Sequence, residues 1–476
     1  MNRPPPTLIA SDARPPAELA AAGFAPVDLY QRREKIFTRA IEGRFQRIRL
    51  YSGWPLLVGY FALPWLDWGH RQAVLLDLPA RQFYIFGLTF WPQDFMLLAW
   101  LLIIAAFALF TVTSVVGRLW CGYTCPQTIW TAIFMWVEQL TEGPRHARIR
   151  LDAAPWTVDK ALRRGSKHAL WLGWAFLTGF TFVGYFTPVR ALAVDVATLH
   201  VGLVTGAWIF FFTAATYINA GWMREQVCIY MCPYARFQSA MFDADTLIVS
   251  YDVARGEPRG SRKRDTRPAG LGDCIDCQLC VQVCPTGIDI RRGLQYQCIG
   301  CAHCIDACDD VMQKVGYEPG LIRYTTEHAL AGKRTRLARP RVVGYALALV
   351  AMAVAFTVAL FDRTLVAIDV LRDRGELYHV DGGTIRNDYT LKLINKTQQA
   401  ATLRLTAVAA AHPELLLEGS NAVAIEGGEV ANVPVSLALP RATPNAQYFD
   451  VAFTACDGAG HCDSETNRFF GPSATR

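Results

Sequence analysis

The sequence predicts a multi-domain membrane protein, in which a five-span α-helical bundle carries a cysteine-rich α+β domain and a C-terminal all-β sandwich. Three observations predict this fold class: apolar runs of spanning length, eight closely spaced cysteines, and strand-like alternation in the last hundred residues. Of the 476 residues, 52% are hydrophobic and only 18% are charged, against about 25% charged in an average soluble domain. A net charge of +6 is too small to indicate a nucleic-acid partner.

Five apolar segments approach the roughly 20 residues that cross a bilayer core. They are residues 51–69, 92–116, 169–188, 201–220 and 341–361. Residues 1–50 are expected to form a disordered, basic tail. Residues 1–28 are rich in Ala and Pro and do not resemble a cleaved signal peptide, and a basic stretch follows them. Residues 126–140 are interpreted as an amphipathic helix at the membrane surface, because Glu138 interrupts a short apolar stretch.

The basic residues predict the orientation of the spans. Lys and Arg concentrate in the tail, in the loop between the second and third spans and in the loop between the fourth and fifth spans. Because Lys and Arg near the ends of spans keep the adjoining segments in the cytoplasm, these segments are expected to be cytoplasmic. The predicted domains are a four-span membrane domain at 51–250, a cytoplasmic domain at 251–335, a fifth transmembrane helix at 336–365 and a far-side domain at 366–476. The basic linker 253–268 is interpreted as a tether near anionic lipid headgroups.

A short cysteine motif occurs twice. Cys-x-Tyr-x-Cys-Pro follows the second span and again follows the fourth, each time with an arginine just upstream (Arg118 and Arg224). The four thiols are Cys121, Cys125, Cys228 and Cys232. A parallel repeat of two helices and a dithiol would bring these thiols together where the two halves meet.

The spacing of each pair puts both sulfurs on one face if the segment is helical. Pro126 and Pro233 suit the first turn of a following helix. Four soft thiolates would select Cu(I), zinc or an iron–sulfur cluster, and the pairs could instead cycle between dithiol and disulfide. Buried inert thiols are the structural alternative.

The strongest motif lies at residues 274–308. Two copies of Cys-x2-Cys-x2-Cys-x3-Cys occur there, with the spacing of a bacterial two-cluster ferredoxin. In such runs the fourth cysteine ligates the other cluster. One predicted 4Fe-4S cluster therefore has the ligands Cys274, Cys277, Cys280 and Cys308, and the other has Cys298, Cys301, Cys304 and Cys284. This predicts a double-cluster ferredoxin-like domain that carries electrons, and a pair of zinc sites is the weaker alternative.

Asp309 follows the second cysteine run and His303 lies inside it. Asp309 occupies the position after the second run where a proline is usual, which affects local geometry and not ligation. His303 lies inside the second run and is expected to be a surface imidazole.

The nine histidines fall in loops, at span ends or in soluble parts, so no transmembrane haem is expected. No dinucleotide or Walker motif indicates NAD(P)H or ATP.

The last hundred residues alternate apolar and polar positions. The segments YTLKLIN, ATLRLTAV, VANVPVSLAL and YFDVAFTA predict strands of an immunoglobulin-like sandwich. Cys456 and Cys462 flank a turn there. A hairpin disulfide and a copper site that includes His461 are both compatible with this spacing.

The combined layout resembles the FixG/CcoG/RdxA family of accessory proteins for cbb-type cytochrome c oxidase. The resemblance rests on the five spans, the two Cys-x3-Cys-Pro pairs, the double-cluster domain and the terminal sandwich, from about residue 30 to 472. It implies a bacterial inner-membrane protein that reduces Cu(II) to Cu(I) for the oxidase, with Cys121, Cys125, Cys228 and Cys232 as copper-handling thiols. It also implies copper as substrate or transient ligand, and a copper-transporting ATPase, oxidase assembly factors or oxidase subunits as partners.

Two other functions stay open. Related membrane iron–sulfur proteins of nitrate and nitrous-oxide respiration share Cys-x3-Cys-Pro pairs, so a quinol dehydrogenase or electron relay is one alternative. A non-enzymatic copper or redox scaffold is the other.

Overall fold

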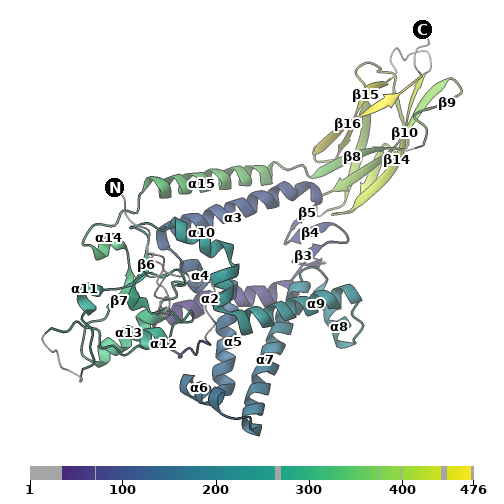
Figure 1. Cartoon of the computed structure of the whole chain (residues 1–476). Helices are drawn as coiled ribbons and strands as arrows, with labels where there is room; N and C mark the ends of the chain where they lie inside the picture. Colours follow the sequence, from purple (N-terminus) through teal and green to yellow (C-terminus); the bar gives the residue numbers. More distant parts are fainter. Residues whose placement is uncertain are drawn as a thin grey trace, which may run out of the picture.

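A computed structural model describes residues 35–69, 71–262, 270–373, 375–397, 399–440 and 448–472. Most of the expected tail (1–34) and part of the basic linker (263–268) lie outside the described residues. The chain forms a helical bundle, with a cysteine-rich domain at one end and a β-sandwich at the other (Figure 1).

Helices occupy all five predicted spans. They are α2 (Arg44–Ala62), α3 (Phe95–Val116), α7 (Val158–Val183), α9 (Leu203–Thr216), which continues as a π-helix over Tyr217–Met223, and α15 (Pro340–Phe361). Three of the described helical segments are long and apolar enough to cross a membrane: Phe95–Val116, Leu203–Met223 and Pro340–Phe361.

The expectation of five clear spans is therefore met only in part. Helix α2 starts at Arg44, inside the expected tail, and has Arg47 and Arg49 in its first turns. Half of the first ten residues of α7 are charged, and the helix ends at Val183 instead of continuing to residue 188. In both helices the apolar stretch is shorter than the roughly 20 residues of a span.

Apolar side chains cover the outside of the bundle. Helix α15 packs along α3. Both helices leave large apolar side chains exposed, for example Leu102 on α3 and Leu347 and Phe361 on α15. A contiguous apolar surface of this kind is unstable in water and indicates a membrane around these helices.

Short helices link the long ones. They are α4 (Leu119–Tyr123), α5 (Pro126–Glu142), α6 (Arg145–Ala153), α8 (Val189–Ala197), a π-helix at Val227–Met231 and α10 (Pro233–Met241). Helix α5, predicted to be amphipathic, packs on α7 and buries Phe134 and Glu138 among other residues.

The loop after α2 contains small sheets that the sequence analysis did not predict. Strands β1 (Asp67–Trp68) and β2 (Arg71–Gln72) pair, and β3 (Val74–Asp77), β4 (Gln82–Ile85) and β5 (Leu88–Phe90) form a three-stranded sheet. These strands lie at the sandwich end of the bundle (Figure 1). The backbone N–H of Leu76 donates to the carbonyl of Tyr185, which joins the loop after α2 to the segment that follows α7.

The cysteine-rich domain is small. Antiparallel strands β6 (Ile248–Tyr251) and β7 (Ile322–Thr325) join its two ends. Between them lie α11 (Val253–Gly256), α12 (Leu279–Gln282), a 3₁₀ turn at Ile290–Arg292 and α13 (His303–Lys314), and α14 (Glu327–Leu330) follows β7. The cysteines and apolar residues such as Met312 and Leu321 share one core.

The C-terminal domain is a two-sheet sandwich with antiparallel pairing. One sheet has the order β12-β14-β10-β8, with β9 beside β10, and the other has the order β13-β11-β15-β16. The strands are β8 (Val366–Arg372), β9 (His379–Asp381), β10 (Thr384–Asn395), β11 (Ala401–Val408), β12 (Leu416–Glu418), β13 (Ala422–Ile425), β14 (Val430–Pro440), β15 (Tyr448–Cys456) and β16 (Cys462–Phe470). All four predicted strand segments are strands, and their inward residues form one core.

A buried ion pair attaches the sandwich to the membrane domain. Lys396 Nζ lies 3.1 Å from Asp94 Oδ1, immediately before α3, and both side chains are less than 10% exposed. Gln82 also donates to the carbonyl of Gly428. The sandwich and the loop after α2 therefore share one end of the bundle.

Candidate iron–sulfur and dithiol site

Two cavities in the cysteine-rich domain are lined by the eight motif cysteines. One is lined by Cys274, Cys277, Cys280 and Cys308, and the other by Cys284, Cys298, Cys301 and Cys304, with Cys280 in contact with both. The fourth cysteine of each run thus faces the cavity formed by the other run, which is the arrangement that the spacing predicts. The assignment of individual ligands stays a prediction.

The backbone explains why the first three cysteines of each run surround one cavity. Asp276 and Gln278 in the first run, and Gly300 and Ala302 at the matching positions of the second, have positive φ angles between 52° and 67°. These left-handed residues curl each loop, so that nearby cysteines face one centre. Asp309, the residue in place of the usual proline, accepts a hydrogen bond from the Gly320 N–H at 2.8 Å and so holds the loop after α13.

The prediction for His303 is wrong, because its imidazole is buried. Its Nε2 atom lies 3.0 Å from Arg49 Nη1 and 2.7 Å from Gln46 Oε1. Burial, followed by the charge of Arg49, lowers the pKa of His303 to about 3. Helix α2 covers this side of the domain, and a reading of the local sequence could not reveal that contact.

The start of α2 is fixed by the cysteine-rich domain. Asp306 of α13 accepts hydrogen bonds from the backbone N–H groups of Phe45 (3.1 Å) and Gln46 (2.8 Å). These amides would otherwise lack partners at a helix N-terminus. The cysteine-rich domain therefore caps the first helix of the bundle.

The dithiol segments are not continuous helices, so the condition for both sulfurs of a pair to share one helical face is not met. Helix α4 ends at Tyr123, and Cys125 and Cys232 have extended backbones immediately before Pro126 and Pro233. The residue before a proline disfavours the helical conformation. The prolines do begin α5 and α10, as predicted.

The structure nevertheless brings the four thiols into one region. Burial, followed by the neighbouring Cys125 thiol, raises the pKa of Cys121 to about 11, and Cys232 adds to this effect. Burial, followed by Cys125 and Cys121, raises the pKa of Cys228 to about 12. Cys121 also lies 3.4 Å from Oε1 of the fully buried Gln238 on α10.

The two repeated arginines tie the halves of the duplication together. Arg118, from the first copy, donates to the carbonyl of Ala235 on α10, which follows the second copy. Arg224, from the second copy, forms a 2.6 Å ion pair with Glu138 on α5, which follows the first. Each arginine thus reaches the opposite half, and this exchange explains why both copies carry one.

The first dithiol segment is in direct contact with the second cysteine run. Arg118 also donates to the carbonyls of Tyr296 and Cys298. A Cβ atom on Gly122 would lie 2.8 Å from the carbonyl oxygen of Gly300. At Gly122 the backbone of the first dithiol segment therefore lies directly against the loop that lines the second cavity.

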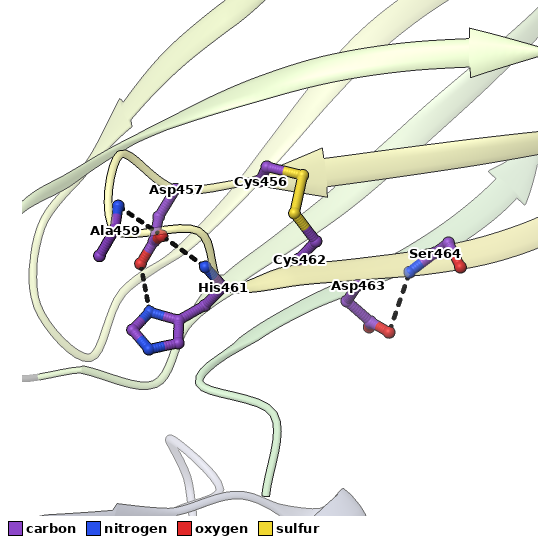
Figure 2. The surroundings of a disulfide bond; sticks show 7 residues. All are labelled: Cys456, Asp457, Ala459, His461, Cys462, Asp463 and Ser464. Carbon is purple, nitrogen blue, oxygen red and sulfur yellow. Dashed lines mark hydrogen bonds and ion pairs between the residues drawn. A yellow bond between two sulfur atoms is a disulfide. The ribbon is translucent and has the colours of Figure 1, made fainter.

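Figure 2 shows that Cys456 and Cys462 form a disulfide across the β15–β16 turn. His461 Nδ1 lies 2.8 Å from Asp457 Oδ2 within the same turn. The disulfide is one of the two alternatives compatible with the sequence, and the sulfurs in this structure are not available to copper.

The donor sets fit iron–sulfur clusters. The first cavity is lined by four cysteines, and the second by four more and by the shared Cys280. Each therefore offers the ligand number and type of a 4Fe-4S cluster. Among the described residues, no three His, Cys, Asp or Glu side chains lie close enough together to hold a single metal ion.

Comparison with known families identifies the class of protein. Residues 223–327 match a 4Fe-4S dicluster domain, residues 98–141 match a 4Fe-4S binding domain, and residues 356–472 match the IG-like fold at the C-terminus of FixG. The fold and site define a membrane-associated iron–sulfur electron-transfer protein of the oxidoreductase class, with an immunoglobulin-like domain.

Whole-chain relatives then give the family. The chain is 41% identical over 441 residues to "Nitrogen fixation protein FixG" of Rhizobium meliloti, with 84% of each chain covered. It is 42% identical over 410 residues to "Protein RdxA" of Cereibacter sphaeroides, which covers 82% of this chain and 86% of the relative. The chain belongs to the FixG family, as the resemblance predicted.

A solved structure of a FixG-related protein from Vibrio parahaemolyticus aligns with 23% of this chain and 97% of its own, at 30% identity and a TM-score of 0.21.

Proposed function

We propose that the chain is a membrane cupric reductase that supplies Cu(I) for assembly of a cbb-type cytochrome c oxidase. One observation carries the proposal: the dithiol segment touches the second cysteine run at Gly122 and Arg118. An electron held in that run then lies next to the backbone that carries Cys121.

In this proposal Cys274, Cys277, Cys280 and Cys308 hold one 4Fe-4S cluster, and Cys284, Cys298, Cys301 and Cys304 hold the other. The clusters, when bound, supply electrons one at a time. Arg118 positions the dithiol segment, because it joins the first copy, the second copy and the cysteine-rich domain through three carbonyls. Its buried guanidinium also favours negative charge nearby.

Cys121, Cys125, Cys228 and Cys232 receive the copper substrate. Cu(II) gains one electron, and the product Cu(I) prefers soft sulfur ligands over oxygen. Because Cys121 and Cys228 hold their protons at neutral pH, binding of Cu(I) releases protons from these thiols. The held ion would then pass to a copper-transporting ATPase or an oxidase assembly partner.

All five predicted spans cross the bilayer in this proposal, with the clusters in the cytoplasm and the sandwich in the periplasm. Helices α2 and α7 would cross as shorter members, supported by packing against their neighbours. The sandwich and the loop after α2 lie at the same end of the bundle, as they must if both are periplasmic. This common position supports the topology.

The test is a single-turnover reaction on the purified full chain with its clusters. The protein is reduced with dithionite, freed of excess reductant and mixed anaerobically with Cu(II) and a Cu(I) chelator. We expect one Cu(I) for each electron lost from the clusters. A quadruple Cys→Ser variant at 121, 125, 228 and 232 should lose the reaction, and the double variant Cys456→Ser/Cys462→Ser should keep it. Full activity in the quadruple variant would contradict the proposal.

A second candidate role for the four thiols is to hold a further iron–sulfur cluster. The match of residues 98–141, which contain Cys121 and Cys125, to a 4Fe-4S binding domain favours it. Iron analysis separates the two roles. Copper-handling thiols predict unchanged iron in the quadruple variant, whereas a further cluster predicts a loss of one third of the iron.

A further inference from the structure

A cavity of about 250 Å³ lies between the bundle and the cysteine-rich domain. It is far larger than the roughly 10–15 Å³ that one water needs. Its walls come from the segment before α2, from α5, from α7 and from the π-helix and turn at 217–225, and Pro285 closes one side. Neither the sequence motifs nor the proposed copper site uses this cavity.

Aromatic rings form one wall. His168 of α7 stacks on Trp222 with an interplanar angle of 14° and meets Trp171 edge-on at 5.3 Å. Tyr217 Oη lies 2.9 Å from His168 Nδ1, which leaves Nε2 as the other polar atom of the ring. Two of the wall residues, Gly221 and Trp222, belong to a π-helical segment, and such segments occur frequently at functional sites.

The charges in the walls favour a neutral ligand. Each lining cation is in an ion pair: Lys35 and Arg164 with Asp152, Lys167 with Glu142, and Arg224 with Glu138. A phosphate or sulfate would have to compete with these carboxylates. A divalent metal ion would meet the four cations. A neutral aromatic molecule with polar ends meets neither obstacle.

The cavity lies where the protein meets the bilayer surface. Trp222 is 53% exposed and is the next-to-last residue of the candidate span Leu203–Met223. Tryptophan at such a position is typical of the membrane–water interface. A ligand dissolved in the bilayer can therefore reach this wall.

Only one residue separates the cavity from the second cysteine cavity. Pro285 lines the large cavity, while its neighbours Cys284 and Thr286 line the cysteine cavity. The positive charge of the Arg49 guanidinium favours negative charge on Cys301, and that of Arg118 favours it on Cys298, both in the second cysteine cavity. Positive charge there favours the reduced form of a cluster and so raises its potential toward that of a mild reductant.

We propose that this cavity binds a lipid-soluble hydroquinone, the electron donor of the chain. The inference rests on the proposed function and supplies its missing first step. Oxidation of the hydroquinone to the quinone breaks two O–H bonds. The two protons pass to His168 Nε2 and to the carboxylate of the buried Glu225. The two electrons equal the capacity of two clusters that accept one each, and the quinone returns to the bilayer.

The test uses menadiol and menadione with the full chain and its clusters in detergent. We expect menadione to bind at one saturable site, measured by equilibrium dialysis, and menadiol to bleach the oxidised clusters anaerobically. His168→Leu should weaken menadione binding at least tenfold. Glu225→Gln should slow bleaching by menadiol at least tenfold. Arg163→Gln, at an exposed position of the same helix, is the matched control and should change neither.

Two further measurements keep the test decisive. Each variant is also reduced with dithionite and then mixed with Cu(II), so a normal copper reaction with a lost menadiol reaction assigns the defect to the donor site. Photolabelling of the unmodified protein with an azido-substituted benzoquinone should mark peptides that contain residues 164–171 or 217–225. Labelling elsewhere, absence of saturable binding, or equal binding by His168→Leu and the unmodified protein would overturn the proposal.

Discussion

Gly122 lies directly against Cys301: a Cβ atom on Gly122 would stand 3.0 Å from the Cα atom of Cys301. This glycine belongs to the first dithiol motif, and the cysteine belongs to the second run of the cysteine-rich domain. The two motifs were recognised separately in the sequence, and the structure makes them one site.

Gly122→Val should separate the two motifs. The added side chain cannot fit against the Gly300–Cys301 backbone, and overpacking of this kind costs about 1–3 kcal/mol. We expect reoxidation of the reduced clusters by Cu(II) to slow at least tenfold, while the bound iron stays constant.

Gly165→Ala is the control for this change, because α7 has open space at that position. It should leave the reaction rate unchanged and stabilise the helix slightly. Equal rates for Gly122→Val and the unmodified protein would show that this contact carries no electrons.

Asp306→Ala should loosen α2. Loss of the carboxylate leaves two helix N-terminal amides without partners, at a cost of about 1–2 kcal/mol. We expect faster loss of cluster absorbance at a fixed elevated temperature. Asp310→Ala on the same helix removes only an exposed pair with Lys314 and should have little effect. Similar rates for both variants would contradict the capping role.

Cys121 and Cys228 should be slow to alkylate in copper-free protein. With pKa values of about 11 and 12, both thiols are almost fully protonated at pH 8, and only the thiolate reacts. We expect modification by iodoacetamide to rise about tenfold per pH unit between pH 7 and pH 9. Peptide mass spectrometry measures the rate at each residue. A rate that levels off below pH 9 would show that burial does not raise these pKa values.

Lys396→Met should release the sandwich from the membrane domain. The change leaves the carboxylate of Asp94 buried without its partner, and breaking a buried pair in this way costs about 3–5 kcal/mol. We expect faster proteolysis between α15 and β8, and gel electrophoresis measures the cleavage rate. Arg190→Met, which removes the exposed pair with Asp67, should not change the cleavage rate. Unchanged cleavage in Lys396→Met would show that the domain is held by other contacts.

Local sequence patterns predicted most helices and strands. They did not predict the contacts between segments that are distant in the sequence. Pro126 and Pro233 marked helix starts correctly, because proline acts on its own turn. The role of Arg49, of Asp306 and of the cavity beside His168 depends on α2 and α7 meeting a domain more than a hundred residues away. Strands β1–β5 were missed because they are only two to four residues long and lie in a loop.

The apolar length of α2 and α7 was overestimated for a different reason. Both segments continue past a turn, so an apolar run in the sequence does not correspond to one straight helix. The repeated arginine just upstream of each dithiol was a visible signal for the contact between the halves. Its partners, Ala235 and Glu138, could not be identified without the fold.

The central claim is that cluster electrons reach Cu(II) at the four thiols. Stopped-flow mixing of dithionite-reduced protein with Cu(II), recording cluster absorbance and chelated Cu(I) in the same trace, tests it most directly. The account predicts that both signals rise together in the unmodified protein and that neither rises in the quadruple serine variant with intact clusters. Reoxidation of the clusters at the same rate in that variant would contradict it.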